Sequence, residues 1–203
     1  MEILDIVDED GMPTGDRIDR ETAHREGIRH RTAHVWIMRR KKNSDFHEEE
    51  ISGAERKICA KYEILLQKRS LDKDSYPGCL DISSAGHIPA GDEVVDSAIR
   101  EMKEELGITI LPKQLHFCGK RKFSFQDIFH GSPFFDRQVS SVYIVWMDIE
   151  KDAMNLQKEE IEDVVWMDFN ECIKMVKENS VKHCIAMEEL QMLQTYILNH
   201  KDI

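Results

Sequence analysis

Short apolar runs rich in β-forming residues, separated by polar and turn-forming segments, predict β-strands along much of the chain. Two such runs flank the turn-forming residues Asp10 and Gly11, which predicts a hairpin over residues 3–20. Residues 43–58 carry many charges without periodicity, so we predict an exposed, mobile loop there. Further strands are predicted at residues 32–38, 61–70, 114–126, 137–149 and 162–169.

Apolar residues that recur every three or four positions predict helices over residues 93–107, 170–180 and 181–201. Residues 21–31 fit either one helical turn or a loop. The order of strands, helix, strands and helices predicts an α+β fold with a central sheet, and no internal repeat or domain boundary is visible. We expect the last helix to pack on this domain or on a second subunit, so a homodimer is also a prediction.

Composition narrows the class of protein. The chain has 203 residues, of which 41% are hydrophobic and 33% charged, and it lacks the long apolar run of a membrane span. The acidic N-terminus does not resemble a signal peptide, and five scattered cysteines without a CxxC pair favour free thiols in a reducing compartment. We therefore expect a cytoplasmic protein that does not bind a membrane.

The net charge of −11 argues against binding to a nucleic-acid backbone, which requires a basic surface. It does not exclude a small phosphorylated substrate, because a bound divalent cation can supply the missing positive charge.

Three glutamates, Glu101, Glu104 and Glu105, lie close together on the helix predicted over residues 93–107 and are named the acid cluster. On a helical wheel they occupy an arc of about 100° beside the apolar face, where the helix meets the body of the protein. Carboxylates at such an edge suit a hard cation such as Mg²⁺ or Mn²⁺. The alternative is a solvated surface stabilised by pairs such as Arg100 with Glu104.

The acid cluster belongs to a longer pattern of spaced residues. Its members are Gly86, Asp92 after five residues, Arg100-Glu101-Met102 after seven more, Glu104-Glu105 after one, and Gly107-Ile108 after one. This pattern resembles the Nudix box, GX5EX7REUXEEXGU, in which U is a bulky aliphatic residue. Asp92 alone departs from it, since the family has glutamate at that position, and aspartate keeps the charge on a shorter side chain.

The resemblance implies the Nudix fold, a mixed β-sheet between helices, in a single domain over residues 1–203. Residues 1–30 would be an N-terminal hairpin extension, residues 30–180 the core and residues 181–203 the C-terminal helix. It also implies hydrolysis of a phosphoanhydride bond in a nucleoside diphosphate derivative or related organic diphosphate. Mg²⁺ or Mn²⁺ would neutralise the phosphate oxygens and activate the attacking water.

The resemblance assigns roles residue by residue. Glu101 and Glu105 would hold the cation, Glu104 would be a further ligand or orient its water, and Gly86 would offer its backbone carbonyl. Catalysis would depend on Glu104, Glu101 and Arg100, with Arg100 positioning the glutamates.

Further candidates are less closely tied to the cation. Asp92 would reach it through water or only cap the helix, a role that aspartate fills well. The base that accepts the water proton can lie in a later loop, where Glu159, Glu160 and Glu162 are candidates. A solvated turn is the alternative for these three.

A narrower resemblance, carried by AHREGIRHRTAHVW, LLQKRS and YPGCLDISSAGHI, is to the Nudix branch of type I isopentenyl-diphosphate isomerase. That isomerase uses histidines with glutamates for its metal, and His24, His30 and His87 fall near the corresponding positions. Whether these histidines bind metal is left open by the sequence.

The isomerase also needs a cysteine that moves a proton to or from carbon. Ser84 occupies its place here, and a serine hydroxyl is too weak an acid or base at neutral pH. Cys79 lies five residues too early. Three readings result: a Nudix hydrolase, favoured here; an isomerase, disfavoured by Ser84; and a non-catalytic ligand-binding module, disfavoured by the intact glutamates.

Overall fold

The structure is a computed structural model that describes residues 2–42, 53, 59–73, 75–129 and 131–200. The loop predicted over residues 43–58 lies outside these ranges, apart from Gly53. No helix among the described residues is long and apolar enough to cross a membrane.

The N-terminal segment forms the predicted hairpin. Strand β1 (Ile3–Val7) pairs antiparallel with β2 (Pro13–Asp19) as a separate two-stranded sheet. Leu4 and Val7 are buried, and the Ala90 N–H donates to the Ile3 carbonyl at 2.8 Å, so the hairpin packs on the domain as predicted. Hydrophobic burial and backbone hydrogen bonds therefore hold it in place.

Residues 21–31, for which the sequence allowed either a helical turn or a loop, begin with a helix, α1 (Arg20–Glu26). The Asp19 carboxylate caps its N-terminus by accepting from the Thr22 N–H at 2.9 Å. Gly27 ends the helix in the left-handed region, at φ 68°, which glycine adopts without steric cost. This turn leads directly into the central sheet.

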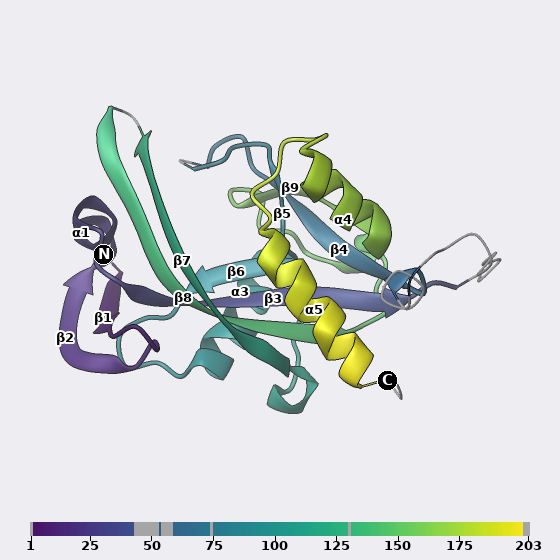
Figure 1. Cartoon of the computed structure of the whole chain (residues 1–203), viewed down its shortest axis with the longest axis horizontal. Coiled ribbons are helices and arrows are strands. Elements are labelled where there is room, and N and C mark those ends of the chain that lie inside the picture. The colour runs from purple at the N-terminus through teal and green to yellow at the C-terminus, as the bar shows by residue number, and fades with distance from the viewer. Residues whose placement is uncertain (1, 43–52, 54–58, 74, 130, 201–203) are drawn as a thin grey trace.

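Seven strands form that sheet: β3 (His30–Arg40), β4 (Tyr62–Arg69), β5 (Leu80–Asp81), β6 (Ser84–His87), β7 (His116–Phe129), β8 (Ser132–Trp146) and β9 (Ile161–Asp168). The main order is β5-β4-β3-β8-β7, with β6 paired to β3 and β9 to β4. Strands β3 and β8 run parallel and the other pairs are antiparallel, so the sheet is mixed. Figure 1 shows the β7–β8 hairpin extending well beyond the rest of the sheet.

Helices cover both faces of the sheet, and the consecutive residues 35–38 of β3 are accordingly all buried, because side chains that alternate along a strand meet apolar surface on either side. Trp36 and Met38 of β3 pack in a core with α4 (Phe169–Glu178) and α5 (Met187–Asn199), whereas Val35 and Ile37 pack in a second core with α3 (Val94–Leu106). Among the described residues, the short 3₁₀ turns η2 (Pro112–Gln114) and η3 (Lys151–Ala153) complete the elements. The predicted α+β class, a mixed sheet between helices with an N-terminal hairpin and C-terminal helices, is confirmed.

The last helix is shorter than predicted and begins at Met187. Before it, the Leu80 N–H donates to the Lys182 carbonyl and the Cys184 N–H donates to the Leu80 carbonyl, both at 3.0 Å. These bonds hold the preceding residues extended beside β5. Helix α5 lies across the domain's own sheet, which is one of the two placements predicted for it (Figure 1).

Candidate functional site

The acid cluster lies on α3, which follows β6 through a turn. Glu93 is the N-cap residue and makes no side-chain capping bond, so the prediction that Asp92 caps the helix is wrong. Asp92 is exposed, and its backbone carbonyl accepts from the Arg31 guanidinium at 3.3 Å. Gly107 ends the helix at φ 71°, as predicted, and its N–H donates to the Lys103 carbonyl at 3.1 Å.

The three carboxylates of the acid cluster differ in burial. Glu105 is 6% exposed and the Glu101 side chain 15%, so these two lie at the edge of the core as the helical wheel predicts. The Glu104 side chain is 52% exposed and points into solvent. A cation at this edge would therefore meet Glu101 and Glu105 first.

Gly86, on β6, lies directly under Glu101. A Cβ atom added to Gly86 would come within 2.1 Å of Glu101 Cδ and 2.5 Å of its Oε1, far inside van der Waals contact. The requirement for glycine is therefore steric: it leaves the space in which the Glu101 carboxylate lies.

Arg100 holds two members of the acid cluster. Its Nη2 lies 2.8 Å from Glu101 Oε1, and its Nη1 donates to Glu104 Oε2 at 3.0 Å. The second contact is the i,i+4 pair predicted from the sequence. Arg100 also reaches the His87 carbonyl at 3.5 Å, which ties the helix to β6.

Burial raises the pKa of Glu105 to about 7, and the nearby Glu101 charge adds to this effect while the Ser84 hydroxyl and Lys73 oppose it. Burial likewise raises the pKa of Glu101. Glu105 Oε2 has no hydrogen-bond partner among the described residues. An orphaned, buried carboxylate oxygen beside a second carboxylate is the environment that a hard divalent cation fits.

A cleft of about 1430 Å³ opens beside this site. Gly86, His87, Lys73, Glu159 and Glu160 are among its lining residues. Of the predicted bases, Glu159 and Glu160 thus face the cleft, and Glu160 forms an ion pair with Lys73. The third candidate, Glu162, pairs instead with Lys68 at 3.0 Å on the surface.

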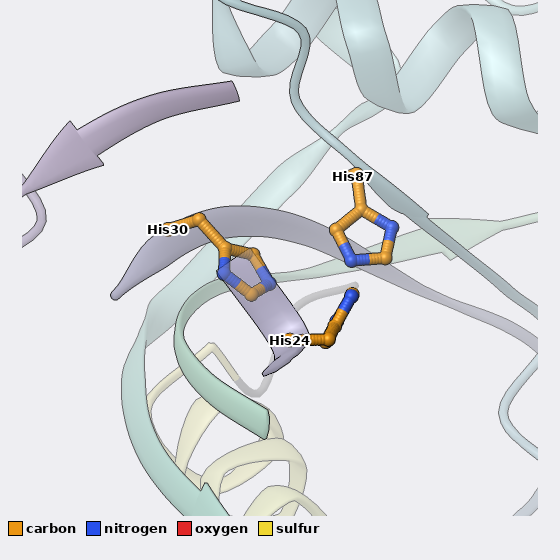
Figure 2. Close-up of side chains that lie close together, drawn as sticks. All are labelled: His24, His30 and His87. Carbon is orange, nitrogen blue, oxygen red and sulfur yellow. The ribbon is translucent and has the colours of Figure 1, made fainter. Parts of the chain in front are cut away.

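Three histidines converge beside the cleft, of which His24 and His87 line it, and we name them the histidine cluster. His24 comes from α1, His30 from the start of β3 and His87 from the end of β6, and Figure 2 shows their rings turned toward one another. One ring nitrogen of each lies within 4.8 Å of the others. The sequence singled out all three residues, although α1 was not firmly predicted.

Hydrogen bonds fix the tautomers of two of these rings. The Nδ1 atoms of His24 and His30 lie 2.9 Å from the backbone carbonyls of Arg20 and Ile28. A carbonyl only accepts, so both Nδ1 atoms carry the proton and both Nε2 atoms keep a free lone pair.

Burial lowers the pKa of His24 to about 4, with a further contribution from His30, and it lowers the pKa values of His30 and His87 as well. Among the described residues, His30 Nε2 and His87 Nε2 have no hydrogen-bond partner. The cluster therefore presents neutral imidazole nitrogens, which are metal-ligand atoms.

The sequence missed Asp136, which lies beside the histidine cluster. Its Oδ1 is 3.8 Å from His24 Nε2 and 3.9 Å from His30 Nε2. Asp136 and Gln138 are two residues apart on β8 and so share one face of the strand. Polar residues at this spacing, on a strand otherwise rich in Val and aromatic residues, were the signal available for finding it.

The fold and site together define a class of protein: a mixed sheet between helices, with a glycine-bearing strand leading into a helix whose carboxylates are half buried. The family model described as "NUDIX domain" matches residues 57–185. The chain belongs to the Nudix hydrolase family.

Relatives agree with this placement. The chain is 36% identical over 174 residues to Nudix hydrolase 3 of Arabidopsis thaliana, a match that covers 84% of this chain and 20% of that longer protein. It is 32% identical over 175 residues to an uncharacterised Nudix hydrolase of Clostridium acetobutylicum, covering 86% of this chain and 74% of the relative.

Solved structures share the fold. DR0079 of Deinococcus radiodurans aligns with a TM-score of 0.62 at 18% identity, over 94% of this chain and 98% of that one. A Caenorhabditis elegans Ap4A hydrolase in a binary complex aligns with a TM-score of 0.51 at 19% identity, over 83% of this chain and 98% of that one. The NUDIX domain of Shewanella oneidensis NrtR in complex with ADP ribose aligns with a TM-score of 0.53 at 12% identity, over 90% of this chain and 94% of that one.

Proposed function

We propose that the chain hydrolyses a phosphoanhydride bond in a nucleoside diphosphate derivative or related organic diphosphate, with Mg²⁺ or Mn²⁺ bound at the acid cluster. The observation that carries this proposal is the orphaned Glu105 carboxylate oxygen, buried beside Glu101. Such a pair is costly unless a cation neutralises it.

In this proposal Glu101 and Glu105 hold the cation, and Gly86 leaves room for the Glu101 carboxylate and offers its carbonyl. Arg100 fixes the direction of Glu101 through the 2.8 Å contact. Glu104 is exposed and accepts a hydrogen bond from Arg100 at 3.0 Å, so its carboxylate is placed where it can orient water beside the site. When bound, the cation would neutralise charge on the phosphate oxygens and lower the pKa of water.

A proton acceptor completes the reaction. Glu160 faces the cleft, and its ion pair with Lys73 restricts its carboxylate to that side. We favour it over Glu162, whose surface pair with Lys68 turns it elsewhere. Asp92, exposed at the end of the loop, would reach the cation only through water.

The charge of the cleft supports dependence on a cation. Acidic side chains outnumber basic ones in its lining, so a diphosphate would be repelled from the metal-free protein. Two proteins of like fold are an Ap4A hydrolase and a NUDIX domain in complex with ADP ribose, both of which involve nucleoside polyphosphates. This chemistry supports a substrate of that class.

The histidine cluster supports a finer placement, in the isomerase-like branch of the family. We propose that it holds a second cation through His24, His30 and His87. Isomerase activity does not follow, because the buried hydroxyl of Ser84 stands where that reaction needs a thiol.

No disulfide joins the five cysteines, all of which lie among the described residues, and this supports the proposal of a reducing, cytoplasmic location. A homodimer stays a prediction.

A hydrolysis screen that separates and quantifies the phosphorylated products by chromatography tests the proposed reaction. Nucleotides, nucleotide sugars, dinucleoside polyphosphates and coenzyme diphosphates are supplied with Mg²⁺ or Mn²⁺ to the native chain, to Glu101→Gln and to the exposed control Glu178→Gln. We expect turnover in the native chain and the control and a loss of about a hundredfold in Glu101→Gln. Equal rates in all three proteins would refute the acid cluster as the active site.

A further inference from the structure

Strand β7 carries side chains that face the cleft instead of a hydrophobic core. Arg121, Phe123 and Phe125 are half-buried and alternate with exposed residues, so they share one face of the strand. Arg121 and Phe123 line the cleft, and neither phenyl ring belongs to either core of the described chain. Phe125 pairs with Asp136, beyond the last pair of β8 with β3, and so lies on the projecting part of the β7–β8 hairpin (Figure 1).

A third ring joins these two from another wall of the cleft. The ring centroids of Phe123 and Phe125 are 6.1 Å apart, and their planes are within 8° of parallel. Tyr76, which also lines the cleft, comes from the loop between β4 and β5 and brings its ring centroid to 6.0 Å from that of Phe125. Aromatic rings attract one another at such separations. We name Tyr76, Phe123 and Phe125 the aromatic row.

Ion pairs fix the β7 end of the aromatic row. The Arg121 guanidinium carbon lies 4.4 Å from the centroid of Phe123, a cation–π contact. Arg121 Nε donates to Glu188 at 2.9 Å and its Nη1 to Glu189 at 3.2 Å. Glu189 is 1% exposed, and its Oε1 lies 2.8 Å from His34 Nδ1. Burial alone would lower the pKa of His34, but the Glu189 charge raises it, so this buried carboxylate holds two cationic partners.

Hydrogen bonds fix the other end. The Arg69 guanidinium donates to the Ser75 carbonyl at 2.9 and 3.2 Å and to the Asp81 carboxylate at 3.0 Å. These bonds anchor the residue just before Tyr76, whose φ of 50° is a left-handed conformation that is costly for a residue other than glycine. Backbone strain of this kind persists where surrounding contacts enforce it, and it is frequent at ligand sites. The aromatic row is therefore held at the cleft before any ligand arrives.

Polar groups around the aromatic row distinguish between two kinds of occupant. Gln138 and Asp136 lie directly opposite Phe123 and Phe125 on β8, so they share the same face of the hairpin. A hydrocarbon chain packed there would bury the amide and the carboxylate without giving them hydrogen bonds, which is costly. A nucleobase offers a flat π surface to the rings and carries N–H groups and ring nitrogens along its edge. The surroundings therefore favour a nucleobase.

We propose that the aromatic row binds the nucleobase of the substrate by stacking, while the diphosphate lies at the acid cluster. The inference rests on the proposed function and narrows its substrate class from organic diphosphates in general to nucleoside diphosphate derivatives. Tyr76, Phe123 and Phe125 are then specificity residues, since they hold the part of the substrate that does not react.

The competing explanation is that the rings only pack the hairpin against the neighbouring loop. It predicts that their loss lowers stability and leaves the preference for a base unchanged. Tyr76→Phe is a control that keeps the ring. Phe117→Leu is the matched control on the same strand, because Phe117 is 51% exposed, contacts Tyr143 at 5.4 Å between centroids and lies outside the lining of the cleft.

The experiment is calorimetry of the full chain with Mg²⁺ and three probes whose P–C–P linkage resists hydrolysis. They are α,β-methylene ADP, methylenediphosphonate, which lacks a base, and the methylene analogue of isopentenyl diphosphate. We expect the native chain to bind the nucleotide at least about tenfold more tightly than either other probe. Tyr76→Leu and Phe125→Leu should each weaken nucleotide binding by about tenfold and change methylenediphosphonate binding by less than about twofold, and the two controls should bind the nucleotide within about twofold of the native chain.

Equal native affinity for the nucleotide and methylenediphosphonate would overturn the inference. Tighter binding of the isopentenyl analogue would also overturn it, because the surface would then hold a hydrocarbon chain. The same holds for an equal loss in Phe117→Leu, or for equal losses of the nucleotide and methylenediphosphonate in the leucine variants, since the effect would then be one of packing.

Circular dichroism confirms folding, and Phe125→Leu provides the test if Tyr76→Leu does not fold. A failure of this inference leaves the proposed hydrolysis untouched, because that proposal is judged by product formation in Glu101→Gln.

Discussion

Replacing Glu105 with glutamine removes a charge that the metal-free fold holds at a cost. Burial raises the pKa of Glu105 from 4.5 to about 7, so the folded protein binds this proton more tightly than the unfolded chain does. The free energy of unfolding of the metal-free protein therefore falls as pH rises from 4.5 to about 7. Above about pH 7 Glu105 is ionised in the folded protein, and the destabilisation by its buried charge is complete.

The size of the cost follows from that pKa. At about 1.4 kcal/mol for each tenfold change in proton affinity, the step from 4.5 to about 7 corresponds to about 3 kcal/mol. Glu105→Gln should stabilise the metal-free protein by about this amount at pH 8 and by almost nothing at pH 4.5. For a domain of this size the gain is a rise in Tm of roughly 6–12 °C.

The assay is thermal and urea unfolding at pH 4.5 and pH 8 in the presence of a chelator. Glu104→Gln is the matched control, because the Glu104 side chain is 52% exposed and its charge remains solvated. The same Glu105→Gln protein should bind Mn²⁺ more weakly and hydrolyse its diphosphate about a hundredfold more slowly.

Higher stability with lower metal affinity is a combination that a solvated surface glutamate cannot produce. A Glu105→Gln protein with native stability at pH 8 and native Mn²⁺ affinity would refute the reasoning.

Three further perturbations have defined outcomes. Gly86→Ala should displace Glu101, because the added Cβ lies 2.1 Å from its Cδ; Mn²⁺ calorimetry and turnover should show at least a tenfold loss in a folded protein, and native values would contradict the steric argument. Glu189→Gln should lower the free energy of unfolding by about 3–5 kcal/mol, since His34 and Arg121 lose a buried counter-charge; a change below about 1 kcal/mol in urea unfolding would show that the pair is solvated. Chelation should abolish turnover and lower Tm, and added Mg²⁺ or Mn²⁺ should restore both; full activity in excess chelator would exclude the proposed cation.

Local spacing was enough to predict much of this molecule. Strands β1, β3, β4 and β8 follow from short runs of β-forming residues, and the positions of Glu101 and Glu105 at the edge of the core follow from the helical wheel. These features depend on contacts between residues close in sequence or on burial of one face of an element. Both are visible in the spacing of apolar and polar residues along the chain.

The rest depends on pairings between distant segments. Asp136 meets His30 because β8 pairs in parallel with β3, in a register that places Gln138 opposite His30. The order of residues along a strand shows which side chains share a face, but it does not show which strand pairs with it or in what register. The contact of Asp136 with the histidine cluster could therefore not be predicted from the sequence. The Asp92 cap was wrong for a local reason: the helix begins one residue later, with Glu93 as its N-cap, and helix ends vary by a residue or two.

The parallel pairing of β3 with β8 also bears on how the chain is made. Strands β4 and β6 pair with β3 along one edge, and β8 occupies the other edge throughout. Thr32 and Ser140 are 108 positions apart, so at ordinary translation rates β3 waits roughly 5–20 seconds for this partner. During that interval a largely apolar strand has an open edge, the kind of surface that joins other chains. Nascent chains that end before β8 should therefore aggregate or occupy chaperones, and this long-range pairing should slow folding.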